Sequence, residues 1–105
     1  MATHSSGNHG MALARAAACR GIVCTVVMPE TAPQAKIDAV RGYGGQIVFC
    51  EPRNAARQET LDAVIADSGA NFVPPYDDAR VIAGQGSCAK ELLEDVPDLD
   101  IVIAP

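Results

Sequence analysis

Short runs of apolar residues alternate along this chain with stretches in which apolar residues recur every three or four positions. Residues 22–28 and 46–50 are apolar runs rich in Val and Ile, and they lack the polar alternation of a half-buried strand. Such runs are typical of parallel strands that are buried on both faces. The stretches between them have the period of amphipathic helices. This alternation predicts an α/β fold, a small doubly wound parallel sheet with helices on both faces in three α/β/α layers.

Alanine content and glycine positions set the expected limits of the helices. The alanine-rich stretch 11–20 predicts a helix that Gly21 ends. The last predicted helix extends to about Glu94, and Gly84 and Gly86 inside it imply close packing or a later start. Side chains that accept hydrogen bonds mark the other helix starts, because they cap free N–H groups. The predicted caps are Thr31 (with Pro33 in the first turn), Asn54 (before a helix over 55–68) and the loop 76–78. Further strands are expected at 1–4, 71–73 and 100–104.

The predicted elements divide the chain into two parts. Residues 1–76 form the expected small α/β domain, and residues 77–105 form a helix and a strand that lead into a large domain outside this sequence. Because the chain opens on its most functional-looking loop, we also expect that upstream residues are missing. A chain divided in this way exposes apolar surface, which favours self-association through the domain interface and through edge pairing of 101–104.

Charge and cysteine spacing exclude several classes of partner. The net charge of the 105 residues is −5 and the eight basic residues are scattered, which argues against binding to nucleic acid or to a membrane surface. No apolar run reaches the length of a membrane span, and no stretch has the build of a signal peptide. The four cysteines show no C-x-x-C spacing. We therefore expect reduced thiols, no metal site and a cytoplasmic location.

The chemistry-bearing stretch is the sequence Ser-Ser-Gly-Asn-His-Gly at residues 5–10, hereafter the 5–10 loop. It joins the first predicted strand to the alanine-rich helix, so it lies at the carboxyl edge of the sheet, where α/β folds bind ligands. Two hydroxyls, an amide and an imidazole surround a helix N-terminus, which suits an anion. The glycines permit positive φ and close approach of the backbone. The alternative is an ordinary strand-to-helix turn with Ser as a cap and Gly as a hinge.

The order of residues in the 5–10 loop decides between these alternatives. With Thr3 and His4 before it, the loop resembles the asparagine loop of fold-type II pyridoxal-phosphate enzymes, above all the serine racemase and threonine (serine) dehydratase group. Three further stretches resemble the same family in order and spacing, and together they cover essentially the whole chain. They are residues 28–33 (Met-Pro-Glu-Thr-Ala-Pro) with Lys36, residues 43–48 (Tyr-Gly-Gly-Gln-Ile-Val) and residues 82–87 (Ile-Ala-Gly-Gln-Gly-Ser).

The resemblance implies roles for individual loop residues. Ser5, Ser6, Asn8 and His9 are implied to bind the substrate carboxylate, the substrate being a small amino acid such as serine or threonine. Gly7 and Asn8 are implied to contact pyridoxal phosphate, with Asn8 bonding its ring hydroxyl. Ser6 is the implied catalytic residue, on the cofactor face opposite the family's lysine, where it would exchange the α-proton of the substrate. Removal of that proton precedes either β-elimination or reprotonation.

The chain also departs from the family pattern. The family's Schiff-base lysine lies upstream of the asparagine loop, and neither Lys36 nor Lys90 lies in a motif that matches that lysine. The family's phosphate-binding loop follows the strand that ends this sequence. We therefore expect a fragment of a dehydratase or racemase that is inactive alone and holds no covalent cofactor. The alternatives are a non-catalytic isolated α/β domain and a flavodoxin-like small-molecule binding module.

Overall fold

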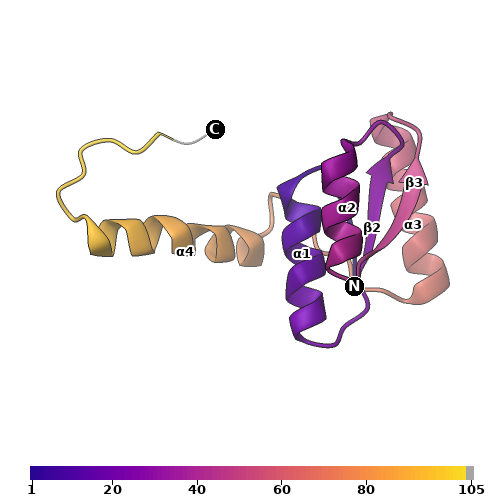
Figure 1. The fold of residues 1–105 in the computed structure, drawn as a ribbon, viewed down its shortest axis with the longest axis horizontal. Helices are drawn as coiled ribbons and strands as arrows, with labels where there is room; N and C mark the ends of the chain where they lie inside the picture. Colours follow the sequence, from indigo (N-terminus) through magenta and orange to yellow (C-terminus); the bar gives the residue numbers. More distant parts are fainter. Residues whose placement is uncertain (104–105) are drawn as a thin grey trace. The chain divides into compact units, whose positions relative to one another are not determined.

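The computed structural model describes residues 1–103, and the chain falls into two units, Met1–Pro75 and Tyr76–Pro105. Figure 1 shows a layered α/β first unit and a second unit that contains one long helix. The first unit contains three strands and three helices in strict alternation, as the apolar pattern predicts. They are β1 (Ala2–His4), α1 (Asn8–Cys19), β2 (Thr25–Pro29), α2 (Gln34–Gly42), β3 (Gln46–Cys50) and α3 (Asn54–Ser68).

The strands of the first unit form one parallel sheet in the order β1-β2-β3. Thr3 lies opposite Val26, and Val26 lies opposite Ile47. On the free side of β1, a single parallel bridge joins Ala2 to Phe72. The strand expected at 71–73 is therefore reduced to one bridge. Because all strands are parallel, their carboxyl ends meet at one edge of the sheet, and α1, α2 and α3 each begin there.

Helices cover both faces of the sheet, so the predicted three-layer α/β class is confirmed (Figure 1). One core lies between the sheet and the pair α1 and α2, and a second lies between the sheet and α3. Full burial of a Val, Leu or Met side chain contributes about 1.5–3 kcal/mol. The first core contains Ala14, Ala17, Cys24, Val26, Met28, Ile37 and Val40, and the second contains Ala2, Val27, Cys50 and Leu61.

Two glycines allow the helices to approach the sheet closely. A Cβ at Gly10 would lie 2.9 Å from Cγ1 of Val26, which is fully buried. A Cβ at Gly45 would lie 2.8 Å from Cγ1 of Val40 and 3.0 Å from Cβ of Ala14. Glycine at position 10 thus fixes how near the first turn of α1 lies to the central strand.

Several predicted limits are wrong in the first unit. Helix α1 begins at Asn8 rather than at residue 11, so half of the 5–10 loop is helical. Strand β2 begins at Thr25 rather than at residue 22, and Ile22 and Val23 are 44% and 66% exposed. β-Branched residues favour strands, but these two precede the stretch that pairs with a neighbour.

The predicted caps of α2 and α3 are also wrong. Pro33 and Arg53 occupy the N-cap positions of α2 and α3, and neither makes a side-chain cap. Thr31 and Asn54 therefore do not cap these helices. In both cases the chain enters the helix near, but not at, the residue whose side chain could accept from a free N–H group.

The second unit is one helix, α4 (Ala79–Asp95), with flanking segments. Its predicted cap is confirmed, because the carboxylate of Asp78 accepts from the backbone N–H groups of Arg80 and Val81 at 2.9 and 3.4 Å. No residue of α4 is buried. A Cβ at Gly84 or Gly86 would meet nothing within 4 Å, so within the described residues neither close packing nor a late start explains these glycines.

The strand predicted at 100–104 is wrong over the part that the structure describes. Residues 100–103 have no strand assignment, and Ala104 lies outside the described residues. A strand is held by hydrogen bonds to a neighbouring strand, and apolar content alone does not supply that neighbour.

Candidate functional site

The 5–10 loop lies at the carboxyl edge of the sheet, directly after β1. The N–H of Ser5 donates to the carbonyl of Val27 at 3.0 Å, which continues the pairing of β1 with β2 by one residue. The connection that begins with Glu30 follows β2 at the same edge and leads into α2. Two helix N-termini, with their free N–H groups, therefore lie at this edge on the same face of the sheet.

Ser5 supports the loop from within. Its Oγ accepts from the N–H of Gly7 at 3.2 Å and from the N–H of Gly10 at 3.1 Å. These bonds close the turn and satisfy one of the free N–H groups of α1. Gly7 occupies the N-cap position of α1, and Ser5 bonds the first turn from two residues before it. Its implied contact with substrate stays a prediction.

Neither glycine of the loop has a positive φ, and close packing requires a glycine only at position 10. Gly7 has φ −141° at the N-cap position of α1, and the positive-φ glycines of the described chain are Gly21, Gly44 and Gly69. A Cβ at Gly7 would meet nothing within 4 Å, so open space adjoins this part of the loop. The expectation that the loop glycines adopt positive φ is therefore wrong.

Ser6 and Asn8 are the exposed polar side chains of the loop. The Oδ1 atom of Asn8 accepts a hydrogen bond from Nζ of Lys36, which lies in the first turn of α2. Neither α1 nor α2 has an acidic residue in its first turn. The hydroxyl of Ser6 and the amide of Asn8 thus lie beside the Lys36 ammonium and two helix N-termini, and together these donors suit a carboxylate.

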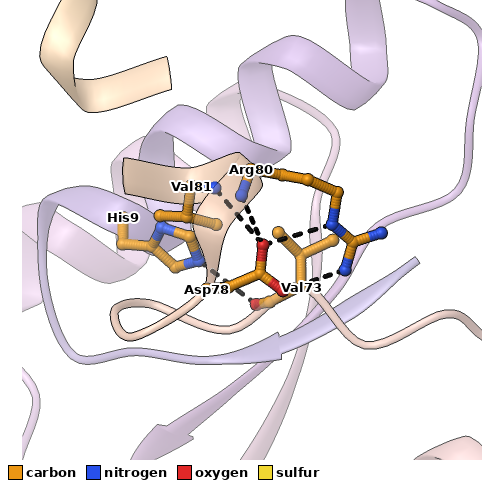
Figure 2. Close-up of polar contacts among 5 residues, drawn as sticks. All are labelled: His9, Val73, Asp78, Arg80 and Val81. Carbon is orange, nitrogen blue, oxygen red and sulfur yellow. Dashed lines mark hydrogen bonds and ion pairs between the residues drawn. The ribbon is translucent and has the colours of Figure 1, made fainter. Parts of the chain in front are cut away.

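His9 connects the loop to the segment after α3. Its Nε2 lies 3.3 Å from the carbonyl oxygen of Val73 (Figure 2). A carbonyl only accepts, so Nε2 donates in this contact. His9 is half-buried. In this structure it therefore orders the loop, and its implied contact with substrate stays a prediction.

His4 ends β1 on the α3 side of the sheet. Its ring stacks on Phe72 with 5.8 Å between ring centroids. Burial lowers the pKa of His4, and the charges of Arg57 and His9 lower it further, so the neutral imidazole is favoured. Within residues 1–103 no group of three metal-ligating side chains occurs.

Two basic residues at this edge escaped the sequence analysis. Lys36 was assigned to a family motif but not to the site, and Arg57 was not singled out. Arg57 lies near the carboxyl ends of β1 and β3, since its charge acts on both His4 and Cys50. Its Nε is buried and has no hydrogen-bond partner among the described residues. Both residues lie in the first turns of helices that follow strands, a signal that the predicted topology already contained.

All four cysteines are free, Cys24 and Cys50 are buried, and burial raises the pKa of both buried thiols. Among residues 1–103, no helix has the length and apolar content needed to cross a membrane.

A parallel α/β domain with an uncharged donor loop at its carboxyl edge defines a small-molecule-binding class of protein. The chain belongs to the pyridoxal-phosphate dependent enzyme family, whose model matches residues 1–105. The resemblance seen in the loop and in the three collinear stretches is thereby confirmed, and the flavodoxin-like alternative is set aside.

Three relatives illustrate the range of the family around this chain. It is 62% identical over 105 residues to a β-hydroxyaspartate dehydratase of Paracoccus denitrificans (strain Pd 1222), covering 100% of this chain and 33% of the relative. A crystal structure of a pyridoxal 5′-phosphate-dependent aspartate racemase is 50% identical with a TM-score of 0.90, covering 94% of this chain and 30% of that one. Maize serine racemase is 40% identical with a TM-score of 0.91, covering 95% and 30%. The chain thus spans about a third of the length of the curated relatives it matches.

Proposed function

We propose that this chain is the substrate-binding part of a pyridoxal-phosphate dependent dehydratase or racemase that acts on a small β-hydroxy amino acid. The observation that carries the proposal is the exposed pair Ser6 and Asn8 at the carboxyl edge of the sheet, beside two helix N-termini. An α-carboxylate placed there would accept from the Asn8 amide and from free N–H groups of α1. Because the chain covers a third of the length of its relatives, we propose this activity for a protein that contains this chain and not for the chain alone.

The donors of the 5–10 loop fit one edge of pyridoxal phosphate. The amide of Asn8 can donate to the ring oxygen of the cofactor, and a Cβ at Gly7 would meet nothing within 4 Å, so the backbone there is open to a ligand. When bound, the cofactor supplies an electron sink that acidifies the Cα–H bond of an amino acid. Among residues 1–103 we assign no lysine to its carbonyl carbon and no loop to its phosphate. We therefore propose that the chain alone holds no covalent cofactor and is inactive.

Ser6 is the proposed proton carrier. Its hydroxyl is exposed at the rim, next to the positions that would hold the carboxylate, so it could take and return a proton at Cα. Departure of the β-hydroxyl after this step would give dehydration. Racemisation would also need a proton donor on the opposite face of Cα, where the resemblance puts the family's lysine, so Ser6 would exchange the proton on its own face only.

The names of two relatives support an acidic substrate as an alternative to serine or threonine. The relative at 62% identity is named for β-hydroxyaspartate and a structural neighbour at 50% identity is named for aspartate. A second carboxylate needs a second cation, and the buried Nε of Arg57 has no partner among the described residues. We therefore propose β-hydroxyaspartate as the first candidate and serine as the second.

The experiment uses the full-length protein that contains this chain, purified with pyridoxal phosphate. It is incubated separately with β-hydroxyaspartate, L-serine, L-threonine and L-aspartate, and ammonia, the 2-oxo acid and the D-enantiomer are measured. Ammonia release from β-hydroxyaspartate that is lost in Ser6→Ala supports the proposal. No turnover of any of the four amino acids, or full activity of Ser6→Ala, would contradict it.

Location remains a proposal as well. The free state of all four cysteines suits a reducing compartment, so we propose the cytoplasm. Fractionation of cells that carry the native gene, with detection by an antibody against the full-length protein, tests this location.

A further inference from the structure

Lys36 and Asn8 join the first turns of two helices that are far apart in sequence. Nζ of Lys36 donates to Oδ1 of Asn8, and 28 positions separate the two residues. Lys36 is half-buried and Asn8 is exposed, so the contact lies at the boundary between the packed helices and the open rim.

The chemistry of this contact fixes the orientation of the amide. An ammonium group only donates, so the amide atom that faces Lys36 must be the oxygen. Oxygen and nitrogen lie on opposite edges of the planar carboxamide, so the NH₂ group of Asn8 then points away from Lys36. A ligand at the loop meets Asn8 as a donor, and the ligand atom there must be an acceptor.

No ion pair explains the position of Lys36. A cation in the first turn of a helix is disfavoured by the helix dipole. The salt bridges within the described part of the chain join Glu51 to Arg53, Asp78 to Arg80 and Lys90 to Glu94, so none involves Lys36. Its contact with Asn8 is the specific interaction of this ammonium.

We propose that Lys36 is a positioning residue, which holds the Asn8 carboxamide with its NH₂ group directed at the acceptor atom of the bound ligand. This proposal rests on the proposed function, in which that acceptor is a carboxylate oxygen of the substrate or the ring oxygen of the cofactor. Lys36 acts through Asn8 and does not itself contact the reacting atoms.

The first experiment needs neither cofactor nor turnover. The 105-residue chain is labelled with ¹⁵N-asparagine, at a concentration at which sedimentation shows a monomer, and its side-chain NH₂ signals are compared among variants. Lys36→Met should shift the Asn8 pair, while Asn54 and Asn71 keep their signals. Lys90→Met is the matched control, because it removes the other lysine of the chain, and it should shift none. Unchanged Asn8 signals in Lys36→Met would overturn the proposal.

The second experiment measures the full-length holoenzyme with β-hydroxyaspartate. Lys36→Met should raise KM about tenfold and change kcat less, since a misdirected amide weakens ground-state and transition-state binding alike. Lys36→Arg keeps a donor at this position and should restore most of the affinity. The double variant Lys36→Met with Asn8→Ala should have nearly the same KM as Asn8→Ala alone. The reason is that both changes remove the same hydrogen-bond donor from the ligand.

The outcomes separate this inference from the proposed function. If the wild-type enzyme turns over no hydroxy amino acid, the proposed function fails, and the asparagine signals still decide the role of Lys36. Two results with an active enzyme would contradict the positioning role of Lys36 and leave the proposed function intact. One is a wild-type KM in Lys36→Met, and the other is that the effects of Lys36→Met and Asn8→Ala on KM add.

Discussion

Ser5 and Ser6 are adjacent hydroxyls with different surroundings. The oxygen of Ser5 accepts from two backbone N–H groups inside the turn, whereas Ser6 is exposed at the rim. Ser5→Ala should lower the free energy of unfolding by about 1 kcal/mol, the usual cost of a lost helix cap. Ser6→Ala should change it by less than about 0.5 kcal/mol and abolish turnover. Urea unfolding of the full-length protein, paired with the ammonia assay, checks both. Equal stability of the two variants would contradict the role of Ser5.

Gly10 is a second residue whose environment admits a sharp prediction. A methyl group there would lie 2.9 Å from a side-chain atom of Val26 and 3.2 Å from Cβ of Ser5. Gly10→Ala should therefore destabilise the fold by about 1–3 kcal/mol through overpacking. Gly42→Ala is the matched control, because that glycine is also helical and a methyl group there meets nothing within 4 Å. Thermal unfolding of both variants tests the prediction, and a Gly10→Ala protein as stable as Gly42→Ala would refute it.

His4 makes stability depend on pH near neutrality. Its native pKa lies below the ordinary 6.5, so below pH 6.5 the unfolded chain binds more protons at this residue than the native chain. The contribution of neutral His4 is complete above pH 6.5 and is lost as the pH falls towards its lower native pKa. Unfolding curves between pH 7.5 and about pH 5 should show this loss in the wild type and a smaller one in His4→Gln. An NMR titration midpoint of His4 at or above 6.5 would contradict it.

At the scale of elements, α4 depends on one cap. The Asp78 carboxylate accepts from two backbone N–H groups and from the Arg80 guanidinium (Figure 2). The hydrogen bonds from Arg80 lower the pKa of Asp78 to about 2. The cap is therefore complete above the ordinary pKa of 3.8 and is lost as the pH falls through about 2.

Removing this cap should shorten the helix. Asp78→Ala leaves the first N–H groups of α4 without their side-chain acceptor, so we expect fraying of the first turn. Faster amide hydrogen exchange at Arg80 and Val81 is the measurement. Asp77→Asn is the control, since Asp77 has φ 56°, a conformation that asparagine tolerates, and makes no cap. Equal exchange in the two variants would speak against the cap.

The elements that the sequence predicted well are those whose signals are local. The run at 46–50 is β3 with the predicted limits, and Leu61 lies on the buried face of α3. The first residues of helices and strands were predicted wrongly where they depend on contacts with residues outside the element. Helix α1 starts at Asn8 because the Ser5 hydroxyl bonds the N–H groups of Gly7 and Gly10. Residues 22–24 have the composition of a strand, but the pairing of β2 with β1 begins at Thr25.

The candidate site was predicted only in part, because some of its contacts depend on residues that are distant in the sequence. The 5–10 loop directly follows a parallel strand in the sequence, and such a loop lies at the carboxyl edge of the sheet. The positions of Ser6 and Asn8 could therefore be predicted. The contact of Asn8 with Lys36 depends on how closely α1 packs beside α2, and that distance is set by small side chains such as Ala14 and Gly45. Spacing along the chain does not contain this packing distance.

At the scale of the whole molecule, the two units differ in what they bury. Met1–Pro75 has a core on each face of its sheet, whereas the described part of Tyr76–Pro105 buries no hydrophobic side chain. Exposed apolar side chains follow one another along the second unit, namely Ile82, Leu92, Leu93, Val96, Leu99, Ile101, Val102 and Ile103. Such a surface associates in water unless another part of a protein covers it.

The 105-residue chain should therefore self-associate, and the second unit should be the cause. Sedimentation velocity over a wide concentration range should show oligomers of the whole chain, while a chain of residues 1–75 should stay monomeric and folded, because both its cores are intact. Leu92→Asp with Leu93→Asp should lower the association. Gln85→Asp with Ser87→Asp adds the same charge at exposed polar positions of α4 and should lower it less. A whole chain that remains monomeric at high concentration, or a 1–75 chain that aggregates, would show that the apolar surface of the second unit does not drive assembly.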